Sequence, residues 1–306
     1  FFKQKTAYEI STRDWSSDVC SSDLVLYHEP CYVSYAPSIA LAFGKSRAIQ
    51  TRPENGFRLD PAAVAQAADG AKVLLLNFPT NPTGAVLAGR ELDALAKACV
   101  EKDLLVISDE IYAELTYEGR HESIVSRPGM RERTILLHGL SKAFAMTGFR
   151  IGYACAPAPL IEAMMKIHQY SILCAPTPSQ EAAIEALKGA ETTTSEARET
   201  YRIRRDFLRR RLQEAGLPCT HPAGAFYLFV DVRCTGLSSK DFALRLLEEE
   251  QVAVVPGSAF GPGGEGFVRC SYATALDRIE VAAERIVRFV GRLKNPTQAP
   301  RLAVVR

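Results

Sequence analysis

Short apolar runs alternate with amphipathic segments along most of this chain, and that alternation limits the folds it can adopt. From Val25 onward, strand-like apolar runs occur at 25–28, 46–51, 71–78, 104–110, 134–140 and 149–156. Apolar strands separated by helical segments are typical of a parallel sheet whose crossover helices cover its faces. We therefore predict an α/β fold with three αβα layers around a mostly parallel, doubly wound sheet.

The pattern changes after Pro157, where helical periodicity dominates and includes a long charged segment from about Ser195 to Gly216. Strands that alternate in polarity follow at 225–232 and 267–273, together with helices at 241–251 and 275–294. These elements predict a smaller α+β domain at the C-terminal end. We set the parts at 1–24 for a leader, 25–200 for the large domain, 201–293 for the small domain and 294–306 for a tail.

Composition excludes several classes of function. The formal net charge of +2 gives no basis for binding nucleic acid or an anionic membrane. No apolar run approaches the roughly 20 residues that a membrane-spanning helix requires. The 8 cysteines are scattered singly, without metal-site spacing, so we expect neither a metal site nor a disulfide framework. A reducing cytoplasm is the expected location.

The first 24 residues lack helical or strand periodicity and do not lead naturally into the strand that follows. The run KQKTAYEI is one reading frame of a common sequencing-library adapter, and DWSSDVCSSDL is the read-through of the second half of that adapter. We expect this leader to be a sequencing artefact that replaces the native N-terminal segment, and we leave it out of the fold prediction.

Polar side chains lie where three of the predicted strands end, and each has an ordinary explanation when taken alone. Asn81 lies in an Asn-Pro-Thr-Gly turn, Asp109 can cap a helix, Tyr112 can pack in the core, and Lys142 can extend to solvent from a strand end. The apolar neighbours of Lys142 also suit a nucleophilic amine, because burial disfavours the charged ammonium. The carboxyl ends of parallel strands form the ligand-binding edge of such a sheet.

Two arginines extend this group. Arg150 follows Lys142 by eight residues and can approach the same edge, although a surface ion pair is the ordinary explanation. Arg269 lies inside an apolar strand of the small domain, where a cation is costly unless it binds an anion. A lysine, a carboxylate, an arginine for phosphate and an arginine for carboxylate together match the needs of a pyridoxal phosphate site that handles amines.

Three motifs resemble the fold type I, class I and II aminotransferases: NPTG at 81–84, SDEIY at 108–112 and SKAFAMTGFRIGY at 141–153. The resemblance extends from Val25 to about Leu293 and includes PAGAFY at 222–227 and VPG at 255–257. It implies a pyridoxal 5'-phosphate-dependent transaminase that moves an amino group between an α-amino acid and a 2-oxo acid.

The resemblance also implies roles for individual residues around the cofactor ring. Lys142 corresponds to the lysine that holds the cofactor as a Schiff base and then moves the substrate proton, and Asp109 to the acid that pairs with the pyridine nitrogen. Asn81 and Tyr112 correspond to the donors to the phenolic oxygen of the ring, and Tyr32 to the aromatic residue that stacks on it. Lys142, Asp109 and Tyr112 are the expected catalytic residues.

The remaining roles concern the anionic groups of cofactor and substrate. Arg150 corresponds to an arginine that binds the cofactor phosphate, and Arg269 to the arginine that clamps the substrate α-carboxylate. Many relatives place a hydroxyl residue three positions before the lysine, where this chain has Gly139, so that Ser141 is the only nearby hydroxyl for the phosphate. The resemblance implies a cis peptide bond between Asn81 and Pro82.

The expected leader occupies the place of a segment that the family uses for packing and phosphate binding. We therefore expect the 306-residue chain to fold poorly and to be inactive, and the full-length protein to be a homodimer with shared sites. Two alternatives share these motifs in part: a cofactor-sensing transcription regulator whose aminotransferase-like domain remains, and a pyridoxal phosphate-dependent carbon–sulfur β-lyase. The motif around Lys142 favours the transaminase over the regulator.

Overall fold

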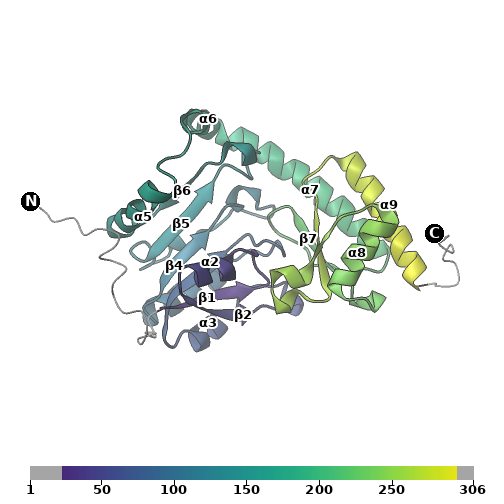
Figure 1. Cartoon of the computed structure of the whole chain (residues 1–306), viewed down its shortest axis with the longest axis horizontal. Helices are drawn as coiled ribbons and strands as arrows, with labels where there is room; N and C mark the ends of the chain where they lie inside the picture. Colours follow the sequence, from purple (N-terminus) through teal and green to yellow (C-terminus); the bar gives the residue numbers. More distant parts are fainter. Residues whose placement is uncertain (1–22, 295–306) are drawn as a thin grey trace, which may run out of the picture.

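The computed structural model describes residues 23–294, and the larger of its two sheets confirms the predicted alternation (Figure 1). Its strand order is β2-β1-β3-β4-β5-β6, in which the first five strands are parallel and β6 is antiparallel to β5. The strands are β1 (Leu24–Glu29), β2 (Lys45–Gln50), β3 (Ala71–Asn77), β4 (Leu105–Asp109), β5 (Thr134–Gly139) and β6 (Gly152–Cys155).

Helices cover both faces of this sheet because side chains that alternate along each strand point to opposite faces. Leu74 and Leu76 of β3 belong to the core beneath α3 (Pro61–Ala67) and α4 (Arg90–Glu101). Leu75 packs instead with Tyr35 and Ile39 of α2 (Tyr35–Leu41). The sheet and the helices on its two faces form the expected three layers.

The second sheet has three antiparallel strands in the order β7-β9-β8: β7 (Tyr227–Asp231), β8 (Val255–Pro256) and β9 (Phe267–Ser271). It packs against α8 (Ser239–Glu250) and α9 (Leu276–Lys294), whose Phe242 and Phe289 rings meet edge to face at 5.3 Å. This is the smaller α+β unit that the sequence predicts.

Three helices connect the two sheets: α5 (Ala158–Ser171), α6 (Thr177–Lys188) and α7 (Ala190–Glu214). The long helix α7 begins five residues before the expected Ser195, and the Thr194 hydroxyl bonds back to the Ala190 carbonyl at 2.7 Å. Because α7 runs across residue 200, the expected domain limit falls inside a helix (Figure 1). The domain limits stay a prediction.

Short 3-10 turns complete the described secondary structure: η2 (Pro53–Asn55), η3 (Ala113–Leu115), η4 (Ile124–Ser126), η5 (Thr147–Phe149), η6 (Arg233–Thr235), η7 (Gly257–Phe260) and η8 (Pro262–Gly264). Residues 1–22 of the expected leader and 295–306 of the expected tail lie outside the described residues. Leu24, the last residue of that leader, is the first residue of β1. Within 23–294, no helix is long and apolar enough to cross a membrane.

The two domains touch through backbone atoms at Gly84 and Gly224. The amide of Gly224 donates to the Gly84 carbonyl at 3.0 Å. Gly84 has a φ of +70°, and a Cβ there would lie 2.2 Å from the Pro222 Cβ. Only glycine therefore permits this approach, which holds the Asn81 loop against the small domain.

Candidate active site

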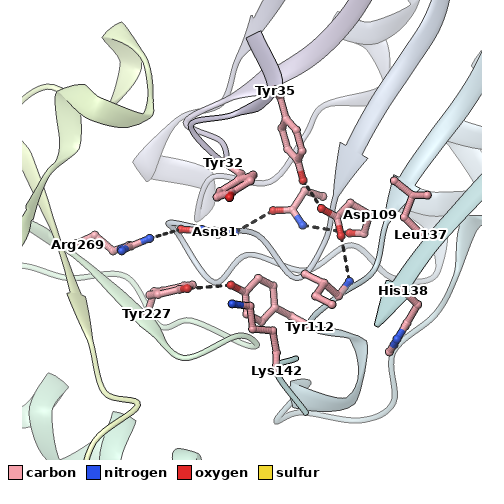
Figure 2. A pocket seen from close by; sticks show the side chains of 12 residues that line it. Tyr32, Tyr35, Asn81, Asp109, Tyr112, Leu137, His138, Lys142, Tyr227 and Arg269 are labelled. Carbon is pink, nitrogen blue, oxygen red and sulfur yellow. Dashed lines mark hydrogen bonds between the residues drawn. The ribbon is translucent and has the colours of Figure 1, made fainter. Parts of the chain in front are cut away.

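A cavity of about 440 Å³ lies at the carboxyl ends of β3, β4 and β5, where the two sheets face each other (Figure 2). Six of its lining residues are ones that the sequence predicts: Tyr32, Asn81, Asp109, Tyr112, Lys142 and Arg269. The other six are Tyr35, Asn77, Ile111, Leu137, His138 and Tyr227. Residues 188 positions apart in the chain thus meet around one space.

Lys142 enters this cavity from the loop that follows β5, three residues after the strand ends (Figure 2). Its side chain is half-buried. The structure gives its amine neither a hydrogen bond nor an ion pair within residues 23–294. An amine without a partner inside a cavity is available to a ligand.

Asp109 ends β4 and is a half-buried acid that lacks a cationic partner among the described residues. Its carboxylate accepts hydrogen bonds from the Tyr35 hydroxyl at 2.6 Å and from the Ile111 amide at 3.2 Å. Burial raises its pKa above the ordinary value, against the effect of those two donors. A carboxylate without a cationic partner can bind a cationic ligand atom, such as a protonated pyridine nitrogen.

Asn77 and Asn81 form a buried amide pair beside Asp109. The Asn77 amide nitrogen donates to the Asp109 carbonyl at 3.1 Å, and its oxygen accepts from the Asn81 backbone amide at 3.1 Å. The peptide bond between Asn81 and Pro82 is cis, which confirms the expectation. These bonds position the Asn81 side chain at the cavity.

Arg269 reaches the cavity from β9 and lies over two aromatic rings, 4.3 Å from that of Tyr227 and 5.0 Å from that of Phe260. Its Nη1 donates to the Asn81 side-chain oxygen at 2.8 Å, and its buried Nε has no partner in the described structure. No carboxylate among residues 23–294 pairs with it. A guanidinium with unused donors is the group that binds a carboxylate through two parallel hydrogen bonds.

Two tyrosines with neighbouring hydroxyl groups, Tyr112 and Tyr227, line the cavity. The Tyr112 and Tyr227 hydroxyl oxygens lie 2.8 Å apart (Figure 2). Burial raises the pKa of both phenols, so both are neutral at physiological pH. Tyr32 is 42% exposed, and its ring meets that of Tyr35 edge to face at 5.5 Å.

Comparison with known proteins decides the family. The family model for aminotransferase class I and II matches residues 18–286. The chain belongs to this family. The match covers most of the chain and begins inside the expected leader, six residues before β1.

Named relatives point to the same activity. The chain is 46% identical to the putative aminotransferase YugH of Bacillus subtilis over 87% of this chain and 69% of that protein. It is 45% identical to an aspartate aminotransferase of Pyrococcus abyssi, over 88% and 70%. A solved aromatic aminotransferase from Pyrococcus horikoshii superposes with a TM-score of 0.86 at 47% identity, over 89% and 74%. The chain is thus similar to aminotransferases with different named substrates.

This aminotransferase is therefore a pyridoxal phosphate-dependent transaminase that acts on amino acids and 2-oxo acids. The comparisons do not favour the transcription regulator or the β-lyase. The cavity fits the cofactor on structural grounds, because a half-buried acid without a cation and an amine without a partner line the same space. No group of histidine, cysteine, aspartate or glutamate within 23–294 could hold a metal ion.

The structure leaves both predicted phosphate residues, Arg150 and Ser141, outside the cavity lining of the aminotransferase. Arg150 is exposed at the end of η5 with a φ of +53°, and its Nη1 donates to the Thr147 carbonyl at 2.9 Å. Ser141 is next to Lys142, and its carbonyl accepts from the Thr147 hydroxyl at 2.8 Å. Both follow β5 in the same loop as Lys142 but do not line the cavity, so their role at the phosphate stays a prediction.

Sequence reasoning missed Tyr35, Asn77 and Tyr227, although each had a detectable signal. Asn77 ends an apolar strand, as Asp109 does. Tyr35 begins α2 three residues after Tyr32, a spacing that brings both rings to one side of the turn. Tyr227 lies in the PAGAFY motif that supports the family resemblance.

Proposed function

We propose that Lys142 and Asp109 are the central catalytic pair of this aminotransferase. Lys142 would hold the cofactor through its amine, and that amine, when free, would move the substrate proton. Asp109 holds a proton on the pyridine nitrogen. The observation that carries this proposal is that one cavity holds both an amine without a partner and a half-buried carboxylate that lacks a cation.

Pyridoxal phosphate, when bound, would supply an electron sink for the substrate carbon that loses its proton. Arg269 binds the α-carboxylate of the amino acid, and its hydrogen bond to Asn81 orients the amide of that residue. Because the Asn81 oxygen is occupied by Arg269, its amide nitrogen is available to donate to the phenolic oxygen of the cofactor. Tyr112 supplies the second donor to that oxygen.

The remaining predicted residues contact the ring face and the phosphate. Tyr32 covers the ring by stacking, which its position on the cavity wall supports. Arg150 and Ser141 bind the phosphate, and their place in the loop that carries Lys142 supports that role. Arg150 must then turn from the Thr147 carbonyl toward the anion.

The reaction is tested by incubating the full-length protein with amino acids in the presence and absence of 2-oxoglutarate. We expect a new 2-oxo acid to form only when the acceptor is present. Formation of pyruvate and ammonia without an acceptor would instead identify a β-lyase.

We also propose that residues 1–24 derive from a sequencing adapter, which the two translated adapter runs support. Sequencing the source locus tests this, and a genomic read that contains the leader would refute it. The full-length protein is the product that this locus encodes. We propose that the 306-residue chain folds poorly and is inactive, and robust transamination by the expressed 306-residue chain would refute this.

Assembly and location complete the proposal. We propose a homodimer, because α5 buries none of its side chains and exposes Ile167 and Tyr170 to 71% and 79%. Sedimentation of the full-length protein tests this. We propose a cytoplasmic location, which the 7 free cysteines among the described residues support. Fractionation of the source cells tests the location.

A further inference from the structure

Tyr227, the first residue of β7, lines the cavity and contacts both Arg269 and Tyr112. The Arg269 guanidinium carbon lies 4.3 Å from the centre of the Tyr227 ring. The Tyr227 hydroxyl lies 2.8 Å from that of Tyr112 (Figure 2). One side chain therefore supports the carboxylate-binding arginine with its ring and a cofactor-binding phenol with its oxygen.

A count of protons sets the direction of the bond between the two phenols. Each neutral hydroxyl carries one proton, so only one of the two can donate to the other. In the proposed function, Tyr112 donates its proton to the phenolic oxygen of the cofactor. The remaining proton between the two tyrosines must then come from Tyr227.

The ring of Tyr227 contributes separately from its hydroxyl. Arg269 lies over the Tyr227 and Phe260 rings and pairs with no carboxylate of residues 23–294. A guanidinium over the face of an aromatic ring is attracted by the electron density of that face. The ring thus holds the cation in place before the substrate arrives.

We propose that Tyr227 is a positioning residue that acts through two partners: its hydroxyl donates to Tyr112, and its ring holds Arg269 for the substrate carboxylate. This inference rests on the proposed function, in which Tyr112 and Arg269 contact cofactor and substrate. The two contributions are separable by mutation, because phenylalanine keeps the ring and removes only the hydroxyl.

The first experiment is a pH titration of the visible absorbance of pyridoxal phosphate bound to the full-length protein. Donated hydrogen bonds favour the anionic phenolic oxygen, so weaker donation by Tyr112 raises the pH at which the bound chromophore loses its proton. We expect Tyr227→Phe to raise that midpoint by about 0.3 to 1 pH unit, the size expected for one hydrogen bond.

The Tyr112→Phe background tells whether Tyr227 acts through Tyr112. In that background, Tyr227→Phe should leave the midpoint unchanged, because the hydroxyl that it orients is absent. A shift of equal size in both backgrounds would overturn the inference, since Tyr227 would then act directly on the cofactor. Unchanged titration of the single Tyr227→Phe variant would overturn it as well.

The second experiment measures the binding of two carboxylates without an amino group, maleate and 3-phenylpropionate, by titration calorimetry. Tyr227→Phe should bind both as the wild type does, whereas Tyr227→Leu should bind both about 3- to 30-fold more weakly. Equal binding by the leucine variant would refute the role of the ring. Circular dichroism of each variant confirms that it is folded.

Tyr201→Phe is the matched control, because it removes a hydroxyl from the same aromatic cluster outside the cavity. The Tyr201 ring lies 5.5 Å from that of Phe226, which in turn contacts Tyr227. Neither measurement should change in this variant. The visible absorbance of pyridoxal phosphate bound to the wild-type protein distinguishes failure of the proposed function from failure of the inference on Tyr227. If no visible band depends on Lys142, both fail. With that band present, a failure of the tyrosine variants concerns Tyr227 alone.

Discussion

Arg269 of the small sheet donates a 2.8 Å hydrogen bond to the side-chain oxygen of Asn81, 188 residues earlier in the chain. This bond crosses from the small domain to the loop after β3. It joins the residue proposed to bind the substrate carboxylate to one proposed to bind the cofactor.

Replacing Arg269 with lysine should raise KM for the amino acid about 10- to 100-fold, with a smaller effect on kcat. Lysine keeps the charge but loses the planar pair of donors that matches a carboxylate. Steady-state kinetics of the full-length protein measures the effect. Arg278→Lys, which changes an arginine at the start of α9, should leave KM unchanged. An unaltered KM in the Arg269 variant would place the carboxylate elsewhere.

Replacing Lys142 with alanine should abolish turnover and the visible absorbance that depends on covalent attachment of the cofactor. The amine has no partner in the described structure, so the free energy of unfolding should change by less than about 0.5 kcal/mol. Spectroscopy and urea unfolding measure the two effects. Lys97→Ala on the exposed face of α4 serves as the control. Survival of the absorbance would remove Lys142 from its role.

Replacing Asp109 with asparagine should stabilise the cofactor-free protein while weakening cofactor binding. Burial raises the pKa of Asp109, so the folded state holds its proton more tightly than the unfolded state does. The cost of ionising it is therefore present above the folded pKa and disappears as pH falls through that value. We expect a higher Tm for the variant at pH 8 and a difference that shrinks toward pH 4. A lower Tm at pH 8 would contradict this account.

Glu110, beside Asp109, should stabilise the fold at the higher pH values, where ionised Asp109 destabilises it. Burial opposes its ionised form, but donors at His121, Ser123 and Ser108 outweigh that cost and lower its pKa. A carboxyl with a lowered folded pKa contributes stability above its unfolded value, about 4.3, and loses it as pH falls through the folded pKa.

Glu110→Gln should therefore reduce the free energy of unfolding by about 1–3 kcal/mol at pH 7 and by less below about pH 4. Urea unfolding across this pH range measures the change. Glu132→Gln, at an exposed position, should have little effect at either pH. A constant difference at all pH values would show that ionisation of Glu110 plays no part.

Replacing Gly84 with alanine should destabilise the protein more than the same change at Gly89. Both glycines have positive φ, but a Cβ at Gly89 meets nothing within 4 Å, whereas at Gly84 it clashes with Pro222 and Gly224. We expect a loss of about 1 kcal/mol at Gly89 and a further 1–3 kcal/mol at Gly84. Thermal unfolding compares the two, and equal losses would show that the domain contact tolerates the extra atom.

The sequence was sufficient for the sheet and for part of the site. Parallel strands place their carboxyl ends together, so Asn81, Asp109 and Lys142 could be assigned to one edge from strand positions alone. Side-chain direction could not be read in this way. The left-handed backbone at Arg150 turns its guanidinium to Thr147, a detail set by local φ rather than by strand pattern.

Contacts between residues far apart in the sequence are the second feature that could not be predicted from the sequence. The partnership of Tyr227 with Tyr112 and Arg269 depends on how the two sheets face each other, which apolar periodicity does not record. The Asp109 interaction with Tyr35 is similar, because it joins β4 to the start of α2 across 74 residues. Such pairs follow from the packed fold and not from local propensity.

The backbone contact between Gly84 and Gly224 has a consequence for engineering. Because backbone atoms make this junction, small domains from related enzymes can be exchanged only if both glycines are kept, whatever side chains surround them. Chimeric proteins with new small domains should therefore retain both positions and vary the side chains that line the cavity. The Gly84–Gly224 contact would then hold each new small domain in the same position against the large domain.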